Sequence, residues 1–167
     1  IHARNAILNG LSTRKNRSVP PLRYDDVMKL KETFPYLKIY INGGIVNMEN
    51  LNKLMTIYGG VMLGRKIYDD PMFLNDIEKN IFFSDSNLST HDVICRYIDQ
   101  LDPEDNQNRL YVLKHLTNLY KGTCHAKKWR KFLHSVINSD QPLQSVKNFN
   151  YRNKNEERKI NCSQSQY

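Results

Sequence analysis

The sequence is poor in the residues that build disulfide scaffolds, membrane spans and secretory leaders. Its 167 residues include three cysteines, an odd number and widely scattered, so we expect no disulfide framework and a reducing compartment, either cytoplasm or organelle. No apolar run is long enough to cross a bilayer and no signal-peptide pattern opens the chain, so no membrane association is expected. The chain starts at Ile1 rather than at methionine, which indicates a fragment or a processed piece of something longer.

Acidic residues are scarce at both ends of the chain. The formal net charge is +8, and residues 109–167 hold twelve Lys or Arg against three Asp or Glu. Residues 1–23 hold five basic residues and no acid. Two basic patches on either side of a neutral middle predict a polyanionic partner that is held at two places. The alternative is a solubilising surface followed by a basic tail.

The first half of the chain shows short apolar runs that alternate with helical patterns. The expected elements are helices over residues 24–34 and 48–58 and strands over residues 37–41 and 61–63. Short connections between alternating helices and strands are typical of a parallel sheet with outer helices. The sequence therefore predicts an α/β unit.

Glycine is rare too, yet it ends both of these apolar runs. Gly43 and Gly44 follow the first expected strand, and Gly64 follows the second. Glycine lets backbone N–H groups approach a ligand closely, and Arg65, directly after the second turn, would add a fixed positive charge. Together they predict a cup for a phosphate group at the carboxyl ends of two neighbouring strands. The spacing alone fits ordinary tight turns equally well.

After residue 71 the strand signals stop and amphipathic helical patterns follow. We expect helices over residues 72–82, 90–101, 106–121 and 126–138. Across the chain, the apolar positions expected to face the core include Val27, Leu30, Phe34, Met55, Leu110, Leu113, Leu116, Tyr120 and Trp129. With a boundary near residues 83–89, we expect an α/β part over 1–83, a helical part over 84–140 and a basic, disordered tail over 141–167.

Several motifs, taken in order, are similar to those of one known family. They are His2-Ala3-Arg4, Gly10-Leu11-Ser12 with Asn16-Arg17, Pro20-Pro21-Leu22-Arg23-Tyr24, Ile41-Asn42-Gly43-Gly44-Ile45, Gly60-Val61-Met62-Leu63-Gly64-Arg65 and Ala126-Lys127-Lys128-Trp129-Arg130. At these spacings the chain resembles the tRNA-dihydrouridine synthases from residue 1 to about residue 138. Among them it looks like the tRNA-dihydrouridine(20/20a) synthases, which modify uridines of the D-loop.

The resemblance implies an α/β fold: the C-terminal part of an FMN-binding TIM barrel, followed by an all-α helical bundle that recruits tRNA. It implies that FMN, reduced by NADPH, passes hydride to the uridine ring while a cysteine acid protonates the neighbouring carbon. The residues that would contact FMN are His2, Asn42, Gly43, Gly44, Gly64 and Arg65. The residues that would contact tRNA are Arg14, Arg17, Lys127 and Arg130. We expect a monomer.

The chain departs from the family pattern because only the last two barrel strands are complete in it. None of Cys95, Cys124 and Cys162 matches the acid cysteine, and Cys124-His125 lacks metal-ligand spacing. We therefore assign no catalytic or metal-binding residue and expect this chain alone to be inactive. The alternative function is a tRNA-binding module without chemistry. A third possibility is a sugar-phosphate aldolase or isomerase, which the glycine turns permit but which leaves the basic helix unexplained.

Overall fold

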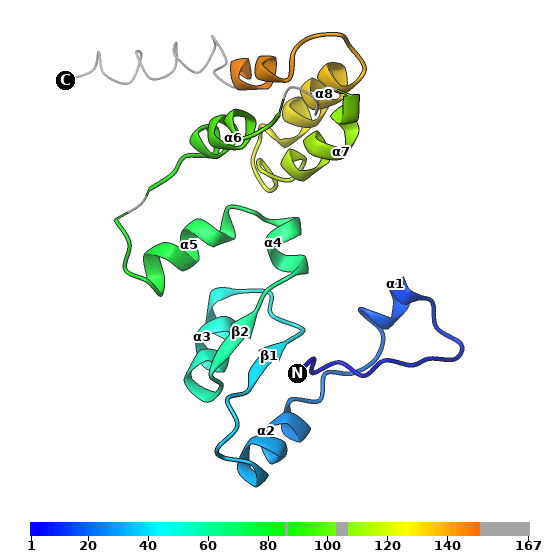
Figure 1. Ribbon diagram of the computed structural model, residues 1–167, viewed down its shortest axis with the longest axis vertical. Coiled ribbons are helices and arrows are strands. Elements are labelled where there is room, and N and C mark those ends of the chain that lie inside the picture. The colour runs from blue at the N-terminus through cyan, green and yellow to red at the C-terminus, as the bar shows by residue number, and fades with distance from the viewer. Residues whose placement is uncertain (86, 103–106, 151–167) are drawn as a thin grey trace, which may run out of the picture. The chain divides into compact units, whose positions relative to one another are not determined.

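The computed structural model describes residues 1–85, 87–102 and 107–150, and it divides into two compact units (Figure 1). The first unit is Ile1–Ile67, and the second begins at Tyr68. This division lies before the boundary expected near residues 83–89. The reason is local: the carbonyl of Tyr68 accepts a hydrogen bond from the Asn118 side chain at 3.0 Å, and the Met72 side chain packs on the helical core.

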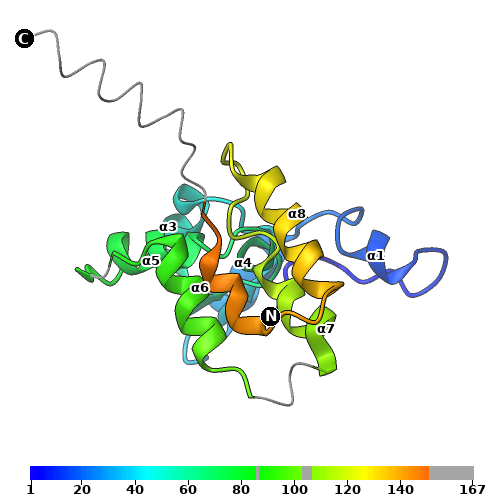
Figure 2. The ribbon, with the colours of Figure 1, turned by 90° about the horizontal axis from the view of Figure 1, so that it is seen from above.

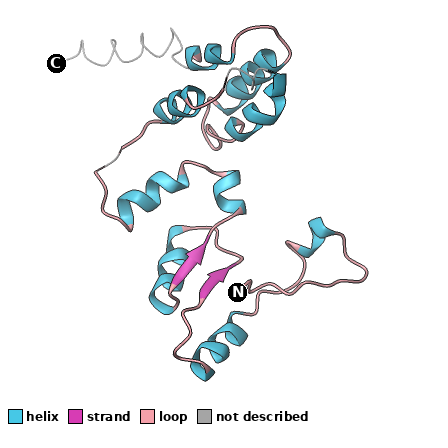
Figure 3. Cartoon of the chain, in the orientation of Figure 1, coloured by secondary structure: helices cyan, strands magenta, loops and turns pink. Residues whose placement is uncertain are grey.

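The first unit is built on a small parallel sheet. Strand β1 (Tyr40–Asn42) pairs with strand β2 (Gly60–Met62), with Ile41 opposite Val61, and the two arrows run the same way in Figure 3. On the other side of β1, the Asn42 amide donates to the Ile1 carbonyl at 2.8 Å and the Ala3 amide donates to the Asn42 carbonyl at 2.7 Å. Residues 1–3 therefore extend the sheet, with His2 bridged to Asn42 in parallel.

Four helices belong to or begin in this unit, and two of them alternate with the strands as predicted. Their bounds are α1 (Thr13–Asn16), α2 (Tyr24–Thr33), α3 (Met48–Ile57) and α4 (Arg65–Asp69). Helix α3 starts where the Asn47 side chain accepts a hydrogen bond from the Asn50 amide at 2.8 Å. Its Leu51 and Leu54 are buried. The predicted α/β alternation is confirmed.

Some details of the predicted packing in this unit are wrong. Strand β1 starts at Tyr40, three residues later than expected, because the Leu37 amide donates to the Phe34 carbonyl in a turn instead of joining the sheet. Leu30 and Phe34 are each 36% exposed and Met55 is 39% exposed, although all three were expected in the core. In α3 the burial falls on Leu51 and Leu54 and leaves the neighbouring Met55 at the border of the buried face.

The second unit consists of helices joined by turns and loops, with no strand among its described residues. Its elements are α5 (Phe73–Asn80), α6 (Thr90–Asp99), α7 (Arg109–Leu113), the 3-10 helix η2 (Lys114–Leu116), α8 (Ala126–Ile137) and the 3-10 helix η3 (Leu143–Asn148). Trp129 is fully buried at the centre, and its indole N–H donates to the Leu116 carbonyl at 2.8 Å. Among the residues that the structure describes, no helix is long and apolar enough to cross a membrane.

Among the described residues, the prediction of a single helix over residues 106–121 is wrong. This stretch is split into α7 and η2, followed by turns up to residue 125. Leu113, Leu116 and Leu119 are all buried, and their spacing of three residues suits the three-residue turn of a 3-10 helix. Leu110 was expected on this stripe but is 67% exposed.

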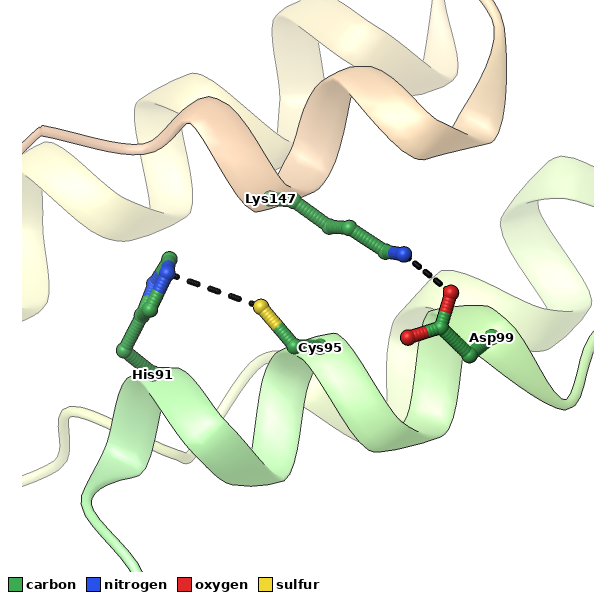
Figure 4. A network of polar contacts seen from close by, with 4 residues as sticks. All are labelled: His91, Cys95, Asp99 and Lys147. Carbon is green, nitrogen blue, oxygen red and sulfur yellow. Dashed lines mark hydrogen bonds and ion pairs between the residues drawn. The ribbon is translucent and has the colours of Figure 1, made fainter.

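The prediction of a disordered tail from residue 141 is also wrong for its first ten residues. Leu143, Val146 and Phe149 are buried in the helical core, and η3 lies beside α6 in both views (Figures 1 and 2). An ion pair between Lys147 of η3 and Asp99 of α6 joins the two elements (Figure 4). Burial of these three apolar side chains in the neighbouring core stabilises this otherwise polar segment. Residues 151–167 of the predicted tail lie outside the described residues.

Candidate functional site

Three neighbouring chain segments of the first unit end at one edge of its sheet. Asn42 lies opposite Met62 and is bridged to His2, so the turns that follow β1 and β2 leave the sheet side by side. This edge holds all the residues predicted to contact a cofactor: His2, Asn42, Gly43, Gly44, Gly64 and Arg65. Their arrangement is that expected for the carboxyl ends of adjacent parallel strands. Their roles stay predictions.

The two glycines after β1 are required by the protein's own packing. Gly43 has φ +108° and Gly44 has φ +76°, in the left-handed region that favours glycine. A Cβ atom on Gly43 would lie 2.9 Å from Cε1 of His2, and one on Gly44 would lie 2.3 Å from Cδ1 of Leu22. The space beside both glycines is therefore taken by side chains of this chain, and not by the close ligand that their place after the strand had led us to expect.

Tyr24 holds this turn, a role that the sequence analysis missed. Its hydroxyl donates to the Gly43 carbonyl at 2.5 Å. A trans peptide is planar, so fixing the Gly43 carbonyl also points the Gly44 N–H in the opposite direction. Burial raises the pKa of Tyr24, and the charge of Arg4 acts against that rise. The Pro-Pro-Leu-Arg-Tyr run contained the residue, but only the fold brings it to Gly43.

Backbone donors and a cation are available at this edge. The N–H groups of Gly44 and Ile45 donate to no backbone carbonyl in the described part of the chain. Gly64 is exposed with open space beside it, and the exposed Arg65 opens α4 directly after it. Free amides and a guanidinium group suit a phosphate better than a neutral ligand. These residues fit the predicted phosphate cup.

His2 presents a ring nitrogen at the same edge. Nδ1 of His2 lies 3.0 Å from the Arg4 amide nitrogen and 3.2 Å from the Arg4 carbonyl oxygen, so this ring nitrogen is engaged by Arg4 whichever tautomer the ring adopts. The ring lies against Gly43, since its Cε1, Nδ1 and Nε2 atoms all lie within 3.4 Å of a Cβ built there. Nε2 is therefore the ring nitrogen that a ligand beside the turn would meet, as a donor or an acceptor according to the tautomer.

Arg14 and Arg17 lie in a basic loop of the first unit. Both are exposed, in or directly after α1. The Asn16 side chain ties this loop together by pairing with the Ile7 amide at 2.7 Å and the Ile7 carbonyl at 2.8 Å. Arg4 anchors its far end by donating to the Ser18 carbonyl at 3.0 Å. The loop therefore holds positive charge on an ordered backbone.

Lys127 and Arg130 lie on the exposed face of α8. Trp129, Leu133 and Val136 fill the opposite, buried face. The sequence from residue 106 to 139 contains no acid, so nothing in this stretch neutralises the exposed cations. A cationic helix face of this kind suits the phosphates of a nucleic acid.

The cysteines of the described residues belong to the second unit. Cys95 lies on α6 with its sulfur 3.5 Å from Nε2 of His91, on one face with Asp99 (Figure 4). Cys124 is exposed in the turn before α8. Among the described residues, no three His, Cys, Asp or Glu side chains gather in a way that could hold a metal ion. Cys162 lies outside the described residues.

Comparisons with known proteins agree on one family. The family model "Dihydrouridine synthase (Dus)" matches residues 1–155. A tRNA-dihydrouridine(20/20a) synthase of Synechocystis sp. is 38% identical over 139 residues, which are 80% of this chain and 41% of the relative. The proteins of the same name from Pseudomonas putida and Escherichia coli K12 are 35% and 36% identical, over 86% and 80% of this chain and 44% and 39% of theirs. The chain thus spans about two fifths of the length of these curated relatives.

Proposed function

This chain belongs to the dihydrouridine synthase family, and on that premise we propose that it is the C-terminal part of a tRNA-dihydrouridine synthase that uses FMN and NADPH. The proposed reaction reduces uridines in the D-loop of tRNA to dihydrouridine. Residues 1–3, β1 and β2 would be strands of the TIM barrel that the family resemblance implies. The described part of the second unit would be the domain that recruits tRNA.

The edge of the sheet carries this proposal. The amides of Gly44 and Ile45 and the guanidinium group of Arg65 would hold the phosphate of FMN, while Nε2 of His2 would hydrogen-bond to the flavin. Tyr24 would keep the Gly44 N–H directed at the phosphate by holding the Gly43 carbonyl. Bound there, FMN would supply the hydride that saturates the uracil ring. The basic loop and the face of α8 would hold the tRNA backbone.

A titration with FMN and with riboflavin, which lacks the phosphate, tests the cofactor site. The chain should bind FMN at least about tenfold more tightly than riboflavin, as measured by the quenching of flavin fluorescence. The reason is that only the phosphate is held by charge-assisted hydrogen bonds. Arg65→Ala should remove most of this preference, while Lys53→Ala, an exposed cation on α3, should leave it intact. Equal affinity for both flavins, or an unchanged preference in Arg65→Ala, would overturn the phosphate assignment.

The second candidate function is a tRNA-binding module without chemistry. One observation favours it: in the described part of the chain the cysteines are on α6 and in the turn before α8, and none belongs to the sheet unit. The same titration separates the two candidates. Salt-sensitive tRNA binding by a chain that binds neither flavin would favour the module, whereas phosphate-dependent flavin binding favours the enzyme.

A further inference from the structure

The second unit carries an open pocket that none of the predicted cofactor-binding or tRNA-binding residues lines. Its volume is about 500 Å³. It is lined by Gln107, Asn108, Arg109, Leu110, Tyr111, Lys114 and Ile137. Arg109 is structural in this pocket, because its Nη2 donates to the Val136 carbonyl at 2.9 Å and so ties α7 to the end of α8. The pocket therefore has a fixed frame.

Tyr111 is the most accessible ring beside this pocket. It is 65% exposed, and the Nζ atom of Lys114 lies 4.0 Å from its centroid. The ring of His115 meets it edge-on, with centroids 5.9 Å apart and an interplanar angle of 89°. Lys114 lies over the Tyr111 ring and His115 stands perpendicular to it, yet 65% of Tyr111 remains exposed, so much of this residue is accessible to a ligand.

The chemistry of this patch, which we define as Leu110, Tyr111, Lys114 and His115, suits a nucleotide. An exposed ring offers a stacking surface for any base, and the neighbouring ammonium offers a contact for phosphate. The patch lies within residues 106–139, which contain no acid, so its charge complements RNA. Leu110 is 67% exposed beside the ring and would cover the edge of a stacked base.

We propose that the Leu110–His115 patch is a second RNA contact, in which Tyr111 stacks on an unpaired base of the bound tRNA and Lys114 contacts the adjacent phosphate. The proposal rests on the proposed function, because it names the ligand of the same tRNA-recruiting unit. It differs from the contacts of α8, which reach phosphates only. Base stacking needs unpaired nucleotides, so the patch prefers a loop or an end of the RNA to a duplex.

The test measures binding of a fluorescently labelled tRNA transcript by anisotropy at several salt concentrations. Tyr111→Ala should weaken binding by at least about fivefold, the loss typical of one stacked base, and Tyr111→Phe should restore most of it. The slope of log affinity against log salt should stay unchanged in Tyr111→Ala, because no charge is removed, and should fall by about 0.7 to 0.9 in Lys114→Ala. Tyr36→Ala, which removes a 79% exposed ring from the first unit, is the control.

The outcomes separate this inference from the proposed function. If the unmodified chain binds tRNA and Tyr111→Ala has the same affinity for tRNA as Tyr36→Ala, the stacking contact is wrong while tRNA binding stands. If the unmodified chain binds no tRNA at any salt concentration, both fail. A fully paired RNA of equal length supplies the last comparison. Tyr111→Ala should bind this duplex as tightly as the unmodified chain does, and a loss of affinity equal to that for tRNA would overturn stacking.

Discussion

The hydroxyl group of Tyr24, in the first turn of α2, donates a hydrogen bond to the carbonyl oxygen of Gly43, just after β1, across 2.5 Å. The contact joins residues that are 19 positions apart in the chain. Because the Gly43 carbonyl and the Gly44 N–H belong to one planar peptide, a single hydroxyl orients a donor of the candidate phosphate site.

The first prediction concerns this hydroxyl. Tyr24→Phe keeps the ring packed but removes the hydrogen bond, so it should lower the stability of the first unit by about 1 kcal/mol. It should also reduce the preference for FMN over riboflavin, because the Gly44 N–H is no longer directed. Hydrogen exchange at the Ile41 and Asn42 amides measures the first effect, and the flavin titration measures the second. Tyr36→Phe is the matched control, and an unchanged flavin preference would refute the positioning role.

The second prediction compares two glycines with similar backbone angles. Gly44 has φ +76° and Gly10 has φ +86°. A Cβ atom on Gly44 would lie 2.3 Å from Leu22, whereas a Cβ atom on Gly10 would have no atom within 4 Å. Gly10→Ala should therefore lower the free energy of unfolding by only about 1 kcal/mol, because alanine is strained in the left-handed backbone. Gly44→Ala should cost about 2 kcal/mol more, from the clash. Hydrogen exchange in β1 distinguishes them, and equal costs would mean that Leu22 moves aside freely.

The third prediction concerns acid stability of the second unit. Hydrogen bonds from the Ser89 hydroxyl and the Ser89 amide in the capping box lower the pKa of Asp92 below its ordinary 3.8. A lowered pKa in the folded state stabilises the fold above the ordinary value, and this stabilisation is lost as the pH falls through the lowered value. Between about pH 5 and 3, Asp92→Asn should therefore show a smaller loss of stability than the unmodified chain.

Trp129 provides the signal for this measurement, because it is the single tryptophan and is fully buried in the same unit. Its emission should shift to the red as the unit unfolds in urea. Asp140→Asn, which removes an exposed carboxylate outside the helix, is the control. If both variants lose stability with the same pH dependence as the unmodified chain, the capping box does not govern the acid response.

The fourth prediction concerns the face of α8. The double variant Lys127→Glu/Arg130→Glu should weaken tRNA binding at least about tenfold at low salt and flatten its salt dependence, because fewer counterions are released. Lys29→Glu/Lys53→Glu changes the net charge equally on exposed positions of the first unit. A gel shift at two salt concentrations compares the pairs. Equal losses would show that net charge, rather than this face, attracts the RNA.

The sequence predicted the alternating elements of the first unit because their signals are local. The periodic apolar positions of α3, the side-chain cap at Asn47 and the glycines after each strand all act within a few residues. It did not predict the split of residues 106–121, because apolar residues three and four positions apart fit an α-helix as well as a 3-10 helix. It also missed η3, whose ordering depends on a core formed by α6 and α8.

The candidate site divides in the same way. The amino-acid sequence by itself determined that glycines and Arg65 follow the strands and that α8 carries cations opposite Trp129, since both follow from the periods of strand and helix. Only the tertiary structure decided that His2 and Tyr24 hold the Gly43–Gly44 turn, and that Tyr111 is exposed beside Lys114. Those contacts depend on how separate elements pack, and packing is not encoded in any single stretch of the chain.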